Sequence, residues 1–163
     1  MWIALLILLA VGLRVFAGLP PRPAGLVRLS RRDAAFVQAA AETMFPAGGD
    51  PAPSAADAEV LAYVERYLGW HGPPLRLLMR LLFALFEHAT LFLVPTWRRF
   101  SQLDDTARAA YLRGWERSSL YPRRLLFQSL RAIMCLAYVA HPAVEAALGC
   151  ARPAACATKA VTG

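Results

Sequence analysis

One stretch of the chain limits its possible folds more than any other, because prolines mark both of its ends. The stretch runs from Leu75 to Val94, with Pro73-Pro74 before it and Pro95 after it. Proline suits the first turn of a helix and cannot continue one, so this arrangement predicts a single helix. At ~1.5 Å per residue the helix would be about 30 Å long, which is enough to cross a bilayer.

Charged residues inside this run favour a soluble environment over a lipid one. Arg76 and Arg80 occupy its first part, and Glu87 and His88 lie well inside it. A charge near the middle of a bilayer costs about 2.5–3.5 kcal/mol on insertion scales. Apolar residues surround the helix on nearly every side, which is typical of a buried helix. We therefore expect it to form the centre of a soluble bundle, with a buried His88, and keep a second membrane span as the alternative.

The strongest membrane signal lies at the amino terminus. Trp2 to Leu19 is apolar except for Arg14, which can reach the lipid surface along its own stem. A cleaved signal peptide normally begins with basic residues, so residues 1–19 are predicted as a membrane anchor, with a signal peptide as the alternative. The arginines that follow favour a cytoplasmic body by the positive-inside rule. The expected location is the bacterial inner membrane, and a periplasmic body is the alternative.

Helix start and stop signals organise the rest of the chain. Residues 20–28 form a proline-rich linker, residues 29–149 a helical bundle domain, and residues 150–163 a disordered tail. No alternating strand pattern interrupts the bundle. We predict an all-α fold, a bundle of five or six helices with an N-terminal membrane-anchor helix. Besides the stretch already described, the expected helices begin with a cap at Ser30 and end near Met44, follow Ser54-Asp57 and end at Gly69, and span Asp104–Arg117, Arg123–Ala140 and Pro142–Gly149.

Composition restricts the possible partners. The chain is 58% hydrophobic with a mean hydropathy of +0.41, above a typical soluble domain, which points to a membrane segment or a large buried partner surface. The net charge of +7 comes almost entirely from arginine. Because no basic tail with interleaved aromatic residues and no known nucleic-acid module is present, we predict no nucleic-acid partner. Anionic lipid and an acidic protein surface remain as possible partners for the positive charge.

The sequence offers little chemistry of its own. It has no glycine-rich phosphate loop, and none of its three histidines has a His or Cys partner at metal-ligand spacing. The three cysteines form no CxxC motif; Cys135 is expected in the core, and Cys150 and Cys156 are either free or paired. We therefore predict no catalytic residue, no cofactor-binding residue and no metal ligand in this chain.

Arginines near the carboxyl end of the bundle are more informative. Arg113 and Arg117 flank Trp115 on one predicted helix, and further arginines follow on the next. A solvated face is one explanation, and a basic surface that docks an acidic partner or lipid headgroups is the other. The apolar excess favours a docking surface, because monomers rarely expose large apolar patches. The residues predicted at or beside a partner interface are Trp115, Arg117, Arg124 and Phe127.

Two stretches resemble known families. Phe100 to Gly149 is similar to the N-terminal helical region of long-chain fatty alcohol oxidases, which are flavin-dependent GMC oxidoreductases. Leu29 to Leu68 resembles the small-subunit family of gluconate 2-dehydrogenase. The positions that carry the first resemblance are Phe100, Leu103, Trp115, Ser118, Arg124, Phe127 and Gly149.

The resemblance implies that this chain is an accessory subunit and that a second chain is catalytic. The small subunits of gluconate 2-dehydrogenase accompany a separate GMC subunit that carries FAD, so catalysis and FAD are expected in a partner. The characterised small subunits carry twin-arginine export signals, and Met1 to Leu19 contains none. The expected function is a non-catalytic accessory subunit of a membrane-associated, FAD-dependent GMC-type alcohol or sugar dehydrogenase. The alternative is a helical protein that binds a lipid or isoprenoid, with a pocket closed by the turn at Pro95-Thr96-Trp97.

Overall fold

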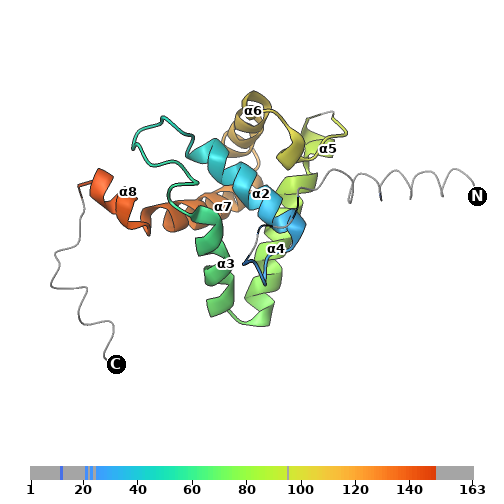
Figure 1. Cartoon of the computed structure of the whole chain (residues 1–163). Helices are drawn as coiled ribbons and strands as arrows, with labels where there is room; N and C mark the ends of the chain where they lie inside the picture. Colours follow the sequence, from blue (N-terminus) through green and yellow to red (C-terminus); the bar gives the residue numbers. More distant parts are fainter. Residues whose placement is uncertain (1–11, 13–20, 22, 24, 95, 150–163) are drawn as a thin grey trace, which may run out of the picture.

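Helices make up all the regular structure in the residues that the computed structural model describes, which are 12, 21, 23, 25–94 and 96–149 (Figure 1). This part of the chain confirms an all-α fold of six helices with at least six residues each. They are α2 Arg31–Met44, α3 Val60–Trp70, α4 Pro73–His88, α6 Asp105–Glu116, α7 Tyr121–Val139 and α8 Pro142–Ala147, with the short α5 Thr90–Leu93 and the single 3-10 turn η1 Phe100–Gln102 between them. The predicted membrane anchor, most of the linker and the predicted tail lie outside the described residues.

Helix α2 occupies the centre of the domain, contacting α3, α4, α6 and η1 (Figure 1). Five of its eight buried residues are alanine, so neighbouring helices approach it closely, and Phe36 fills the space where α4 and η1 meet it. Its buried side chains are Asp33, Ala34, Ala35, Phe36, Val37, Ala39, Ala40 and Ala41.

The prediction that Leu75 to Val94 forms one central, buried helix is wrong on both points. Helix α4 ends at His88, the chain turns at Ala89, and α5 begins at Thr90. Only one side of α4 is buried, and the leucines of its other side are exposed; His88 is half-buried. Just after the break, the Thr90 hydroxyl donates a hydrogen bond to the Arg98 carbonyl of the returning chain. Among the described residues, no helix has both the length and the apolar character that crossing a bilayer requires.

Local capping signals have mixed outcomes. Ser30 and Asp33 form the expected capping box at the start of α2. Ser54 and Asp57 form the same reciprocal hydrogen bonds, yet they close a turn, and α3 begins only after Glu59, which has a left-handed backbone (φ 48°). Gly69 lies inside α3 and does not end it, so its predicted role as a helix cap is wrong.

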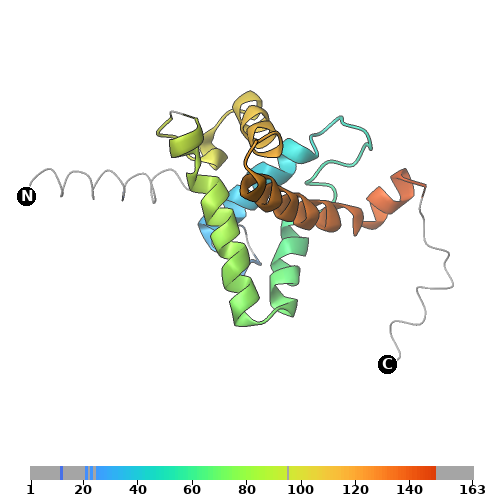
Figure 2. The same ribbon diagram turned by 180° about the vertical axis from the view of Figure 1, so that it is seen from behind.

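The last three helices complete the core. Helix α7 packs on both α3 and α6, and Figure 2 shows it running from the centre of the domain out to α8. Trp115 of α6 lies 4.3 Å from the Phe86 ring of α4, measured between centroids. The hydroxyl of Tyr111 donates to the Phe86 carbonyl over 2.8 Å, and burial raises the pKa of this phenol. The aromatic core therefore joins α4 to α6.

Candidate functional site

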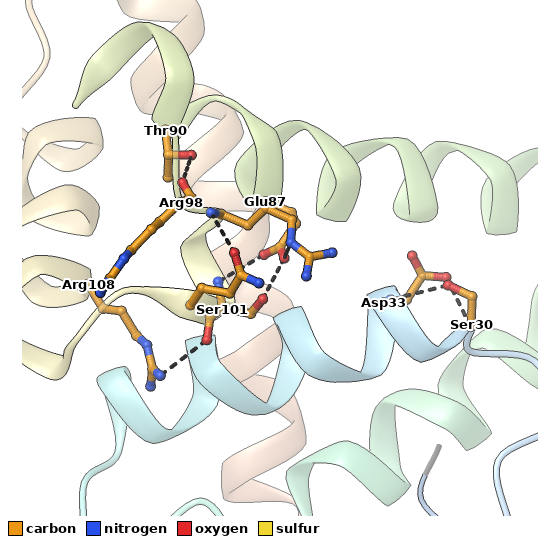
Figure 3. A network of polar contacts seen from close by, with 9 residues as sticks. Ser30, Asp33, Glu87, Thr90, Arg98, Ser101 and Arg108 are labelled. Atoms are coloured by element: carbon orange, nitrogen blue, oxygen red, sulfur yellow. Dashed lines mark hydrogen bonds and ion pairs between the residues drawn. The ribbon is translucent and has the colours of Figure 1, made fainter. Parts of the chain in front are cut away.

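A buried polar centre lies where α4 meets η1. The Glu87 carboxylate accepts hydrogen bonds from the Ser101 backbone N–H (3.1 Å) and from the Ser101 hydroxyl (2.6 Å) (Figure 3). The Nε of Arg99 lies 3.8 Å from the same carboxylate, and both side chains are almost completely buried. Each charge thus has opposite charge or hydrogen-bond donors around it, which is the condition for keeping ions inside a protein. The Glu87 carboxylate therefore joins α4 to η1.

The same centre fixes the chain segment between α4 and η1. The Thr90 hydroxyl donates to the Arg98 carbonyl over 2.8 Å, which joins the two ends of the segment (Figure 3). Arg108 of α6 donates to the Ser101 carbonyl over 3.3 Å. Thr90 and Arg99 are both fully buried, so the base of this segment belongs to the core.

A second buried carboxylate anchors the chain before α2. Glu65 of α3 accepts three backbone N–H bonds, from Val27 (2.8 Å), Arg28 (2.6 Å) and Leu29 (2.8 Å). Burial raises the pKa of this carboxyl, but the hydrogen bonds from Arg28, Leu29 and Val27 outweigh burial, so its pKa is lowered overall. This contact fixes where the preceding chain enters the domain.

An open apolar groove lies between α4 and α7. Its volume is about 420 Å³, and the only polar groups among its lining residues are the hydroxyls of Tyr67 and Ser129. Leu78 and Leu81 on its α4 side are 62% and 57% exposed, far more than core leucines such as Leu68 and Leu130, which are fully buried. The lining residues are Tyr67, Leu75, Leu78, Met79, Leu81, Leu82, Leu85, Leu126, Ser129 and Ile133. We call this surface the α4–α7 groove; it suits apolar side chains of another molecule.

A second groove, of about 680 Å³, lies on the other side of α4, against the start of α2. Arg31, Arg32 and Arg80 contribute positive charge to it, and the Nε of Arg80 lies 3.0 Å from the Asp33 carboxylate. Its wall also includes His88, the last residue of α4. We call this surface the α2–α4 groove; the carboxylates of Asp33 and Glu87 also lie in its wall.

The residues predicted at a partner interface occupy two different environments. Trp115 and Phe127 are only 3% and 5% exposed, so they pack in the core, and the Arg123 guanidinium carbon lies 5.0 Å from the Trp115 ring centroid. Arg124 donates to the carbonyls of Ser118 (2.7 Å) and Ser119 (3.2 Å), which closes the turn between α6 and α7. Arg117 is exposed. Their role in an interface stays a prediction, and only Arg117 presents a freely accessible side chain for it.

Sequence reasoning missed the exposed side of α4. The apolar excess of the whole chain was the available signal, but it did not identify which residues remain uncovered. Within α4 the buried positions carry Met79, Phe83 and Phe86, whereas the exposed apolar positions carry leucine. The described part of the chain holds no group of three His, Cys, Asp or Glu side chains placed to bind a metal ion, and the half-buried Cys135 is a free thiol.

These features define a class of protein: an all-helical domain whose buried polar groups serve the fold and whose open apolar groove suits docking to another chain. The chain belongs to the gluconate 2-dehydrogenase subunit 3 family, and the match covers residues 31–149. Comparison with curated proteins and with solved structures gave no significant match. The expected resemblance to the gluconate 2-dehydrogenase small subunits is thus confirmed, and it extends through Phe100–Gly149. Membership implies partner dehydrogenase subunits.

Proposed function

We propose that this chain is the non-catalytic accessory subunit of a membrane-associated, FAD-dependent GMC-type alcohol or sugar dehydrogenase. It stabilises the catalytic chain and holds it at the membrane. The single observation that carries the proposal is the open α4–α7 groove on a domain whose family is a dehydrogenase subunit. FAD and the reacting groups would belong to the partner.

The groove has the properties of a surface that a permanent partner covers. Leu78, Leu81 and Leu85 recur at helical spacing along α4, so they form one continuous strip. Covering apolar surface contributes roughly 25 cal/mol for each Å² removed from water. Interfaces of obligate complexes are apolar, like a domain core divided in two. The α4–α7 groove has the same apolar composition.

The buried polar groups support a structural role for this chain. Both Glu87 and Glu65 are occupied with hydrogen bonds that join helices and loops. Each of the two residues is less than 10% exposed, and Glu87 also forms part of the wall of the α2–α4 groove. Their chemistry therefore contributes to shape and leaves catalysis to the partner.

Co-purification with the GMC-type catalytic chain tests this function. We expect Leu78→Glu and Leu85→Glu to weaken the complex by more than about tenfold, or ~1.4 kcal/mol, because each places a charge in the α4–α7 groove. Leu148→Glu is the matched control, since Leu148 is 49% exposed at the end of α8 and away from the groove. Unchanged recovery of the flavoprotein with both groove variants would contradict the proposal.

The alternative function, binding of a lipid or isoprenoid, also has an observation in its favour. The α4–α7 groove is apolar and would suit a hydrocarbon chain. The turn at Thr96-Trp97, expected to close such a pocket, does not contribute to the lining of this groove. Native mass spectrometry distinguishes the two functions: a stoichiometric lipid without a flavoprotein partner would favour lipid binding.

A further inference from the structure

The segment between α4 and η1 carries a cluster of exposed apolar side chains. Phe92 is 85% exposed and Trp97 is 55% exposed, and Leu91 and Leu93 are 39% and 36% exposed. Figure 1 shows α5 at the edge of the domain, beyond the end of α4. A side chain as exposed as Phe92 cannot lie in a groove, so this cluster protrudes. We call Leu91, Phe92, Leu93 and Trp97 the α5 tip.

The base of the α5 tip is held firmly. Thr90 and Arg99, which precede and follow the tip, are fully buried, and the Thr90 hydroxyl donates to the Arg98 carbonyl. Glu87 and Ser101 then hold Arg99 and η1 against α4. Both ends of the tip are therefore anchored in the buried part of the domain.

One exposed arginine belongs to the same segment as the tip. Arg98 is exposed directly beside Trp97. The α2–α4 groove, with Arg31 and Arg32 on its wall, reaches His88, two residues before α5. The wall of this groove also holds Asp33, which is paired with Arg80, and Glu87, and the exposed Asp104 and Asp105 follow η1. Arg98 is the exposed charge adjacent to the aromatic side chains of the tip, and in a chain of net charge +7 it matches an anionic surface.

We propose that the α5 tip inserts into the interfacial layer of an anionic bilayer, with Arg98 at the headgroups. Trp and Phe are the side chains favoured at that depth, and arginine beside them contacts lipid phosphate. A protruding tip suits the soft surface of a membrane, whereas a protein partner fits the concave α4–α7 groove. This contact goes beyond the proposed function and does not depend on it, because it requires only the chain and lipid.

Quenching of tryptophan emission by brominated lipid tests the insertion in the full chain. Wild type, Trp97→Phe and Trp70→Phe are compared on brominated phosphatidylglycerol vesicles. Trp70 is the matched control because it is 67% exposed on α3, and any contribution of Trp2 is common to all three proteins. We expect Trp97→Phe to lose part of the quenched emission and Trp70→Phe to keep all of it. Equal quenching of the three proteins would overturn the proposal.

Two further variants separate insertion from charge. Phe92→Glu should reduce quenching of Trp97 on every vesicle, and Arg98→Gln should reduce it on phosphatidylglycerol but not on phosphatidylcholine. Circular dichroism confirms folding, and Leu148→Glu controls for an added surface charge. Quenching that is unchanged in Phe92→Glu would contradict insertion. Shielding of Trp97 from an aqueous quencher by the catalytic chain, but not by vesicles, would make the tip a protein contact and also overturn the proposal.

Discussion

The Glu87 carboxylate lies 3.8 Å from the Nε of Arg99, and the two side chains are only 2% and 0% exposed. Glu87 lies next to Phe86 of the aromatic core, and Arg99 follows the α5 tip, so this ionic contact joins the core to the base of the tip. Burial removes the hydration of both charges. Each charge compensates for the hydration that the other has lost, so the two are stable only as a pair.

Glu87→Gln should strongly destabilise the fold. The change leaves the Arg99 charge buried without its counter-charge, which costs about 3–5 kcal/mol in comparable pairs. Urea denaturation measures the free energy of unfolding. Glu116→Gln is the matched control, because Glu116 pairs with Arg131 at 3.0 Å on the surface, where such pairs contribute about 0–1 kcal/mol. Equal losses in the two variants would contradict the assigned role of the buried pair.

Glu65 should make stability depend on pH under acidic conditions. Its folded-state pKa lies below its ordinary value, so its contribution is fully present above the unfolded-state pKa of about 4.3. The contribution is lost as pH falls through the lower folded-state pKa. Glu65→Gln should cost about 1–3 kcal/mol at neutral pH, since an amide replaces charged acceptors for three N–H groups.

The difference between wild type and Glu65→Gln should therefore shrink as the solution is acidified. Urea titrations at a series of pH values measure it directly. Asp105→Asn is the matched control for loss of a carboxylate, because the Asp105 side chain is 98% exposed. A difference between wild type and Glu65→Gln that stays constant down to acidic pH would argue against this assignment.

Trp115→Ala should lower the stability of the fold, and any loss of partner binding should follow from that loss of stability. Trp115 is buried against Phe86, and removing a buried tryptophan typically costs about 3–5 kcal/mol. Arg117→Ala, two positions along the same chain segment and exposed, should leave the melting temperature nearly unchanged. Parallel melting and partner-binding measurements test the predicted interface: weaker binding in Arg117→Ala at unchanged stability would support it, and unchanged binding would remove Arg117 from it.

Two glycines should respond in opposite ways to alanine. Gly114 lies inside α6 with open space around its Cβ position, so Gly114→Ala should stabilise the domain by about 0.4–1 kcal/mol through higher helix propensity. Gly48 has a φ of +77°, which side chains disfavour, so Gly48→Ala should destabilise it by about 1 kcal/mol. Thermal melts measure both, and stabilisation by Gly48→Ala would show that this loop is not held in its left-handed form.

Some signals confined to a few neighbouring residues predicted the structure correctly. The capping box at Ser30 and Asp33 joins residues three positions apart, so it needs no distant contact. Helix α6 begins and ends within one residue of the predicted Asp104–Arg117, because its capping position and turn are local. Gly69 shows the limit of such signals, since α3 continues through it to Trp70 beside the Arg28 side chain.

The sequence by itself determined the helical class, most helix boundaries and membership of a dehydrogenase-subunit family, because periodicity, caps and family motifs are properties of the linear chain. Only the tertiary structure decided that α2 is central, that α4 is covered on one side, and that Glu87 meets Arg99. Those outcomes depend on which surfaces of distant segments pack together. In α4 the core takes Met79, Phe83 and Phe86 and leaves the leucines exposed, because the neighbouring helices pack against only that side.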